Sequence, residues 1–363
     1  MKEYWSEKAK KLSPYTAGEQ PKEKLIKLNT NENAYPQSPD VAQAVAQAVQ
    51  NLRLYPDPNT EALAEEIARY HNVKPSEVFC ANGSDEALAM CFAAFFAGND
   101  TANSGGWFPS TQSGHGIKTL DVTYSFYPVW ANFFDVPLEI IPLHDDYSVN
   151  IQRMCNSGGV ILANPNAPTG INIPLMDIME IIEKTKGVAV IDEAYAAFSG
   201  SSAIPLVSTY KNLAVVRTLS KSHSLAGLRV GYVIAQENLI NALKTVKDSF
   251  NSYTVDALAQ AGAIAALRDE AYYEETTRKI VDTRVYTVGE LWKMGITCLP
   301  SSANFIFARM DTRPAKSVMA ALREKGILVR WFDGERTQDF LRITIGTRED
   351  MDAFLTAMRE LQI

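Results

Sequence analysis

Hydrophobic positions follow two different periods along the chain, and the two periods alternate. Short, nearly continuous apolar runs are typical of buried strands, whereas longer runs with apolar positions three or four residues apart are typical of amphipathic helices. Strands that alternate with helices predict an α/β fold with a mainly parallel sheet and helices on both faces. The expected strands are residues 78–81, 160–163, 188–191, 213–216 and 228–234, and the expected helices are 85–96, 176–184, 237–250, 255–267 and 271–294.

The two ends of the chain depart from this pattern. The first residues, up to the helix start that Ser38 and Pro39 mark, are irregular and rich in proline. We expect this segment to lie across a surface or a neighbouring subunit. Towards the C-terminus, expected strands at 304–308, 327–331 and 341–345 mix with helices, which indicates a smaller α/β domain. The expected organisation is an N-terminal arm (1–38), a large domain (39–255) and a small C-terminal domain (256–363).

The composition narrows the class of protein. The chain has 363 residues, of which 46% are hydrophobic and 21% are charged, as in an ordinary soluble enzyme. Its 35 basic and 42 acidic side chains leave a net charge of −7, which argues against nucleic acid or an anionic membrane as a main partner. An anionic ligand must therefore be held by a local basic cluster.

Cysteine and histidine spacing points to no disulfide framework and no metal site. The four cysteines form no CxxC pair, and the four histidines show no metal-ligand spacing. The N-terminus has no apolar signal region, and no apolar run approaches the length of a membrane span. The sequence therefore predicts a cytoplasmic protein with reduced thiols.

Two polar turns follow expected strands, at the sheet edge where open α/β folds bind ligands. Gly83, Ser84 and Asp85 join a strand to a helix, and the free N–H groups of that helix start suit a phosphate. An ordinary capping turn, with Ser84 or Asp85 as the cap, is the alternative. Residues 164–170 (NPNAPTG) follow a later strand, where a simple turn is the alternative.

An acid and a lysine also follow expected strands. Asp192 ends an apolar strand, where a carboxylate is costly unless it meets a cation such as a pyridinium. A helix cap or a structural ion pair is the alternative. Lys221 lies beside Thr218 and Ser220, eight positions before Arg229. A desolvated, cation-rich setting favours the neutral amine that imine formation needs, and the arginine with the two hydroxyls could fix a phosphate. A solvated basic loop is the alternative.

The order of these motifs resembles that of the fold type I aminotransferases, which depend on pyridoxal 5′-phosphate (PLP). The detailed sequence of several shorter segments is similar to that of the histidinol-phosphate aminotransferase family, and the similarity covers nearly the whole chain. It rests jointly on residues 12–21 (LSPYTAGEQP), 28–33 (LNTNEN), 55–57 (YPD), 123–127 (TYSFY) and 341–346 (LRITIG).

The resemblance implies a role for particular residues. Lys221 would form the Schiff base with PLP and then move a proton, Asp192 would pair with the pyridine nitrogen, and Tyr195 would hydrogen-bond the ring hydroxyl. Tyr124 would stack on the ring, and Tyr55 would reach the PLP phosphate of a neighbouring subunit, which implies a homodimer. The other implied cofactor contacts are Gly83, Ser84, Asp85, Asn166, Thr218, Ser220 and Arg229. The implied substrate contacts are Tyr15, Asn33, Arg330 and Arg342, with both arginines on the substrate phosphate and Arg342 on the carboxylate of glutamate.

Two stretches depart from the family's pattern. The place before the Pro-Thr-Gly run usually holds a second asparagine that contacts the ring hydroxyl, but here it holds Ala167, with Asn166 one position earlier. Residues 101–118 are rich in Gly, Ser and Thr and stand where a short hydrophobic strand normally leads into the stacking tyrosine. We therefore expect that this polar stretch replaces or displaces the strand and leaves only residues 119–122 (TLDV) of it.

The implied reaction is transamination between L-histidinol phosphate and 2-oxoglutarate, which gives imidazole-acetol phosphate and L-glutamate in histidine biosynthesis. A lyase of the threonine-phosphate decarboxylase kind and an aminotransferase for aromatic amino acids are the alternatives on the same fold. A catalytically impaired variant and a regulator are the non-enzymatic alternatives. A regulator would need a DNA-binding module, for which the chain shows no spare segment and its net charge is unsuitable.

Overall fold

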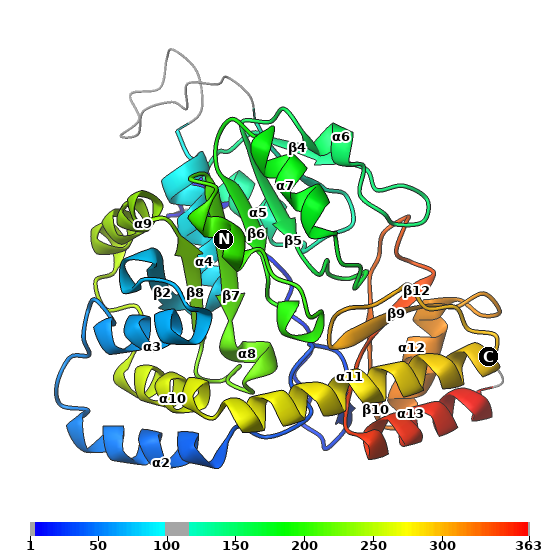
Figure 1. Cartoon of the computed structure of the whole chain (residues 1–363). Coiled ribbons are helices and arrows are strands. Elements are labelled where there is room, and N and C mark those ends of the chain that lie inside the picture. The colour runs from blue at the N-terminus through cyan, green and yellow to red at the C-terminus, as the bar shows by residue number, and fades with distance from the viewer. Residues whose placement is uncertain (1–3, 99–115, 362–363) are drawn as a thin grey trace.

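The computed structural model describes residues 4–98 and 116–361, so residues 101–115 of the polar stretch lie outside the described residues. The predicted α/β fold is confirmed. A seven-stranded sheet lies between layers of helices, and a smaller unit packs beside it (Figure 1). Within the described ranges, no helix is long and apolar enough to cross a membrane.

The large sheet consists of β2 (Val78–Asn82), β3 (Ile117–Leu120), β4 (Leu138–Ile141), β5 (Gly159–Ala163), β6 (Ala189–Asp192), β7 (Leu213–Thr218) and β8 (Val230–Ala235). The strand order is β2-β8-β7-β6-β5-β3-β4. Only β8 runs antiparallel to its neighbours β7 and β2, and the pairs from β7 to β4 are parallel. The central strands β5 and β6 consist mostly of Val, Ile, Leu and Ala and are buried on both faces, as parallel strands covered by helices must be.

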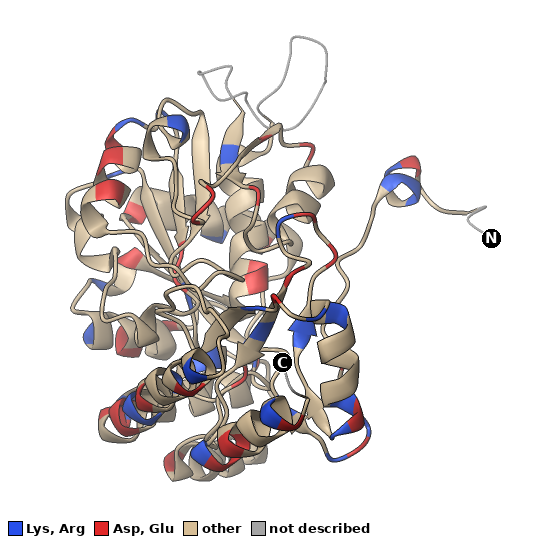
Figure 2. Cartoon of the chain, turned by 90° about the vertical axis from the view of Figure 1, so that its right-hand side faces the viewer, with Lys and Arg blue, Asp and Glu red and all other residues tan. Residues whose placement is uncertain are grey.

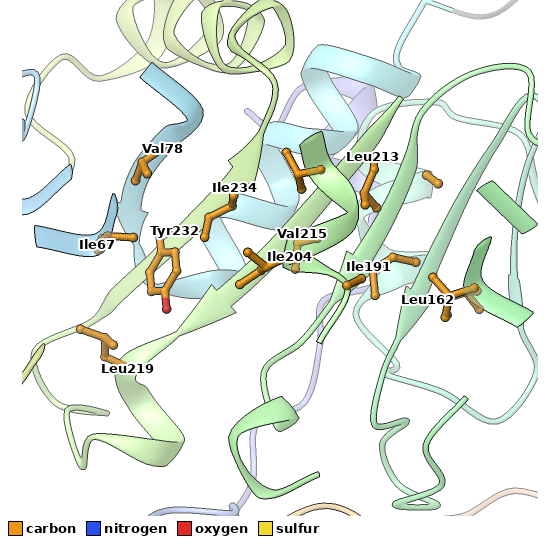
Figure 3. Close-up of a cluster of buried hydrophobic side chains, with 14 of the residues drawn as sticks. Ile67, Val78, Leu162, Ile191, Ile204, Leu213, Val215, Leu219, Tyr232 and Ile234 are labelled. Carbon is orange, nitrogen blue, oxygen red and sulfur yellow. The ribbon is translucent and has the colours of Figure 1, made fainter. Parts of the chain in front are cut away.

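Successive residues of each strand point to opposite faces, so the sheet separates two hydrophobic cores. The core on one face includes Leu162, Ile191 and Val215 from strands and Ile67 from a helix (Figure 3). The helices of that core are α2 (Pro39–Ala48), α3 (Glu61–His71), α7 (Leu175–Glu183) and α10 (Ala257–Arg268). The helices of the other core are α4 (Gly83–Cys91), α5 (Tyr127–Phe133) and α9 (Glu237–Phe250).

The smaller unit combines the C-terminal part of the chain with a piece of the N-terminal segment. Its antiparallel sheet has β12 (Phe340–Thr344) between β11 (Arg330–Trp331) and β9 (Phe305–Arg309). A separate parallel pair joins β1 (Ile26–Lys27) to β10 (Ile327–Leu328). The helices packed on its core are α11 (Glu270–Lys293), α12 (Ala315–Glu324) and α13 (Arg348–Glu360), of which α11 extends from the large unit (Figure 1).

The N-terminal segment is less irregular than the sequence suggests, because it contains the short helix α1 (Glu7–Lys11) as well as β1. Figure 2 shows this end of the chain extending away from the main body. In the same view, basic and acidic residues are interspersed over the outer helices. The expected domain boundary at residue 255 stays a prediction. The helix α10, which begins after that residue, packs on α2 and α3 of the large unit.

Three expectations about elements are corrected. The strand expected at 327–331 is two strands in two different sheets, because the backbone leaves its pairing with β1 before it meets β12. The strand that remains before Tyr124 is β3, which begins at Ile117 instead of Thr119, ends at Leu120, and pairs with β4 and β5. The helix expected at 85–96 begins at Gly83 and ends in a π-helical turn over Phe92–Phe96.

Candidate active site

A cavity of about 410 Å³ lies at the carboxyl ends of β5, β6 and β7, and residues of the N-terminal segment and the small unit complete its lining. That volume is typical of a site for a small ligand. It brings together most of the residues that the sequence singles out. These are Tyr15, Ser84, Asp85, Tyr124, Asp192, Tyr195, Thr218, Ser220, Lys221, Arg229, Arg330 and Arg342.

Asp192 is the last residue of β6 and is 5% exposed. Its Oδ2 accepts a hydrogen bond from the hydroxyl of Tyr127 at 2.8 Å, and its Oδ1 accepts one from the backbone N–H of Ala194 at 3.1 Å. Burial raises the pKa of Asp192 to about 6, and these two hydrogen bonds oppose the rise. Among the described residues, no cationic side chain forms an ion pair with this carboxylate. The cavity is therefore the place from which a cation can reach it.

Lys221 lies in the one-turn helix α8 (Leu219–Ser222), directly after β7. Its Nζ donates a hydrogen bond to the backbone oxygen of Thr30 at 3.0 Å. Burial lowers the pKa of Lys221 to about 8, and the charges of Arg342 and Arg229 act in the same direction. The alternative of a solvated basic loop is wrong, because the amine is enclosed in the cavity and is neutral in part near neutral pH.

The start of α4 forms one side of an anion cradle. Gly83 has a φ of +80°, and a Cβ there would lie 2.5 Å from Nη2 of Arg229. The N-cap of α4 is Asn82, whereas Ser84 and Asp85 lie in the first turn, so neither acts as the cap that the alternative required. Among the described residues, no side chain caps this helix start, so its N–H groups are available to a ligand.

Hydroxyl and guanidinium groups form the other side of the cradle. Nη2 of Arg229 donates to Oδ2 of Asp85 at 3.1 Å, which holds the guanidinium beside the start of α4. The hydroxyls of Thr218 and Ser220 lie 2.9 Å apart and line the same part of the cavity. A helix start, two hydroxyls and an arginine together are typical of a phosphate site.

Aromatic rings occupy the side of the cavity next to β3. The hydroxyl of Tyr124 donates to Oδ1 of Asp85 at 2.9 Å, and its ring meets those of Tyr127 and Tyr15 edge-on at 5.6 and 6.2 Å. Tyr15 also stacks on Phe126 at 4.6 Å. These contacts hold Tyr124 in the cavity, although the polar stretch precedes it in the chain.

Two arginines lie on neighbouring strands at the far end of the cavity. Arg330 on β11 is the register partner of Arg342 on β12. Nη2 of Arg342 donates to the backbone oxygen of Asn29 at 2.7 Å, while its buried Nε has no hydrogen-bond partner among the described residues. Burial lowers the pKa of Arg342. An unpaired, buried guanidinium N–H beside a second arginine suits an anionic group of a ligand.

Four of the sequence-selected residues do not line the cavity. The amide of Asn33 donates to the backbone oxygens of Lys221 and Ser222 at 2.9 and 3.1 Å, so it holds α8 from outside. The amide of Asn166 is engaged by Thr123, Val122 and Thr169, and Ala167 lines the cavity in its place. Tyr55 is 83% exposed and stacks on Tyr253 at 4.8 Å. Gly83 lies directly behind the cavity wall, under Arg229.

Several residues shape the site although no sequence motif predicts a role for them. Nδ2 of Asn31 donates to the hydroxyl of Tyr195 at 2.9 Å, and Tyr127 contacts Asp192 as described. A Cβ at Gly231 would lie 2.3 Å from the backbone N of Ser84, so this glycine lets β8 pass behind the cradle. Asn31 and Tyr127 lie in runs 28–33 and 123–127, which offered a signal, whereas Gly231 offered none.

The described residues contain no set of side chains that could bind a metal ion. Within 4–98 and 116–361, no group of three or more His, Cys, Asp or Glu side chains could hold a metal ion. The cavity therefore combines an anion cradle, an isolated carboxylate, an enclosed amine and a pair of arginines.

Comparisons with known proteins identify the class to which this site belongs. Residues 23–358 match the family model described as aminotransferase class I and II. Histidinol-phosphate aminotransferases from Clostridium acetobutylicum and Clostridium botulinum are 46% and 44% identical to the chain, and each alignment covers 99% of both chains. The chain is thus a class I and II aminotransferase. The chain belongs, within that class, to the histidinol-phosphate aminotransferase family.

A solved structure agrees at the level of the fold. Histidinol-phosphate aminotransferase from Sinorhizobium meliloti, determined in complex with pyridoxal 5′-phosphate, superposes with a TM-score of 0.80. It is 22% identical, and the match covers 93% of this chain and 91% of that one.

Proposed function

We propose that the chain transfers an amino group between L-histidinol phosphate and 2-oxoglutarate with PLP as cofactor, giving imidazole-acetol phosphate and L-glutamate in histidine biosynthesis. The single observation that carries this proposal is one cavity that holds Lys221, Asp192 and the arginine pair together. The full-length similarity to histidinol-phosphate aminotransferases supports the choice of substrate.

The residues of the cavity fit PLP. Asp192 is buried without a cationic partner among the described residues and suits a protonated pyridine nitrogen. The cradle of Ser84, Ser220 and Arg229 suits the phosphate, and a Cβ at Gly83 would press on the guanidinium of Arg229. When bound, PLP supplies an aldehyde that joins amines and a ring that takes up electron density.

The chain's own groups supply the rest of the chemistry. Nζ of Lys221 can accept and return a proton near neutral pH, because its pKa lies at about 8. The carboxylate of Asp192 holds a positive charge in place through a contact that water does not screen. The hydroxyl of Tyr195 accepts from Asn31, which leaves its own hydrogen for an acceptor in the cavity.

The arginine pair explains how two unlike substrates share one site. A phosphate carries close to two negative charges and suits both Arg330 and Arg342, whereas the side-chain carboxylate of glutamate carries one. A threonine-phosphate decarboxylase-like lyase would use the same cradle and arginines. An aminotransferase for aromatic amino acids would need only one arginine, so two of them favour a phosphorylated substrate.

We also propose a cytoplasmic homodimer in which Tyr55 reaches the PLP phosphate of the neighbouring subunit. Tyr55 and Tyr253 form an exposed aromatic pair, and further apolar side chains are exposed nearby in the chain. These are Leu52, Leu54 and Phe250. A surface of this kind is typical of an interface between subunits. Light scattering of the purified protein tests the dimer, and a monomer at micromolar concentration contradicts it.

A half-reaction tests the function directly. Protein loaded with PLP is mixed with L-histidinol phosphate alone, and the absorbance of the lysine-bound cofactor is followed. We expect this band to give way to that of the aminated cofactor and 2-oxoglutarate to restore it. Reaction with O-phosphothreonine or phenylalanine instead would retain the fold and cofactor and overturn the substrate.

A further inference from the structure

Tyr127 is a buried tyrosine whose hydroxyl points at the acid of the active site. It is the first residue of α5, it is 0% exposed, and its hydroxyl lies 2.8 Å from Oδ2 of Asp192. The other oxygen of the carboxylate accepts only a backbone N–H, from Ala194. Among the described residues, Tyr127 is therefore the only side chain that hydrogen-bonds this acid.

The surroundings of Asp192 make this hydrogen bond important. Asp85 and Glu193 place like charge near it, and the hydroxyl of Tyr195 and the thiol of Cys91 also interact electrostatically with its carboxylate. Burial and both acids favour the protonated form of the carboxyl. A phenol O–H that donates to the carboxylate favours the ionised form instead, and it also restricts the rotation of the carboxylate.

We propose that Tyr127 is a positioning residue that keeps Asp192 ionised and turned so that its carboxylate can also meet a cation in the cavity. The inference rests on the proposed PLP chemistry, in which that cation is the protonated ring nitrogen. Without the hydroxyl of Tyr127, the proton between Asp192 and the ring nitrogen would lie on the carboxyl more of the time. The ring would then withdraw electron density less strongly.

The test compares the wild-type holoprotein with Tyr127→Phe, which removes one oxygen atom and keeps the ring. The ring nitrogen of PLP labelled with 15N reports its own protonation by NMR. We expect the signal of the variant to move towards that of the unprotonated nitrogen. We also expect the half-reaction to slow by about 10-fold, the lower end of what a hydrogen bond to a charged group contributes.

Tyr232→Phe is the matched control. Tyr232 is also buried, at 3% exposed, and its hydroxyl lies 2.7 Å from Nε2 of His71 rather than near Asp192. Both variants lose a buried hydrogen bond, so a purely structural role predicts a similar fall in melting temperature and an unchanged 15N signal for both. Unchanged 15N signals in Tyr127→Phe would overturn the proposal.

A second measurement keeps the proposal testable if Tyr127→Phe is unstable. In the Asp192→Asn background, the Tyr127→Phe change should have almost no further effect on the half-reaction, because its action passes through the carboxylate. A full additional 10-fold loss in that background would contradict the proposal. Failure of the wild-type protein to form the lysine-bound cofactor would instead contradict the proposed function itself.

Discussion

Replacement of the active-site lysine should stabilise the cofactor-free protein at neutral pH while it abolishes catalysis. Burial of Lys221 lowers its pKa from 10.5 to about 8, so the folded protein holds a charged amine at pH 7 in a site that disfavours the charge. At about 1.36 kcal/mol per pKa unit, this shift corresponds to roughly 3 kcal/mol of lost stability. Lys221→Met keeps the length of the side chain and removes the charge.

The pH dependence of this effect has a definite sign. Between the folded pKa of about 8 and the unfolded value of 10.5, the unfolded chain binds more protons than the folded one, so wild-type stability rises with pH. Below pH 8 the variant should exceed the wild type by up to about 3 kcal/mol, less the hydrogen bond from Nζ to Thr30. Above about pH 10.5 the advantage should vanish.

Urea unfolding of both cofactor-free proteins, at one protein concentration and from pH 7 to 10.5, measures this difference. Other groups that titrate in this range contribute equally to both proteins and cancel in the subtraction. A stability difference that does not change with pH would refute the reasoning. The same variant should lose transamination by well over the roughly 10²–10⁴-fold attributable to proton transfer alone, because the amine that joins the cofactor is also absent.

Two further variants test separate parts of the site, and a third tests the ion pair between Arg217 and Glu193 outside the cavity. Asp192→Asn should retain PLP but slow the half-reaction by about 10²-fold or more, because the charge that faces the ring is lost; stopped-flow absorbance measures it, and unchanged rates would exclude the role. Arg330→Ala should lower kcat/KM for histidinol phosphate by about 10–100-fold and change that for glutamate far less, and equal losses would remove Arg330 from phosphate recognition. Arg217→Met should lower the free energy of unfolding in urea by about 3–5 kcal/mol. In the wild type, Nε of Arg217 lies 3.5 Å from Oε2 of Glu193, and the variant leaves that buried carboxylate without a charged partner. The double variant with Glu193→Gln should recover much of that loss, and no recovery would contradict the ion-pair explanation.

Much of the fold follows from local sequence pattern. Buried parallel strands need continuous apolar runs, and the helices that cover them need apolar positions every three or four residues, so both leave a clear signature. The helix that starts at Ser38 is an example, because a serine cap and the following Pro39 act within one turn. By contrast, no period in residues 327–331 reveals that the strand changes sheets, because that depends on where β1 and β12 lie.

The sequence by itself determined which residues end the strands at the ligand-binding edge, and so it located Asp192, Lys221 and the Gly83 turn. Each is placed by its own strand and the turn after it, which are short-range properties. Only the tertiary structure decided which groups act on them. Tyr127 and Asp192 are 65 residues apart, and Thr30 and Lys221 are 191 apart. Hydrogen bonds over such separations form only after distant segments have packed, and packing leaves no periodic trace in the chain.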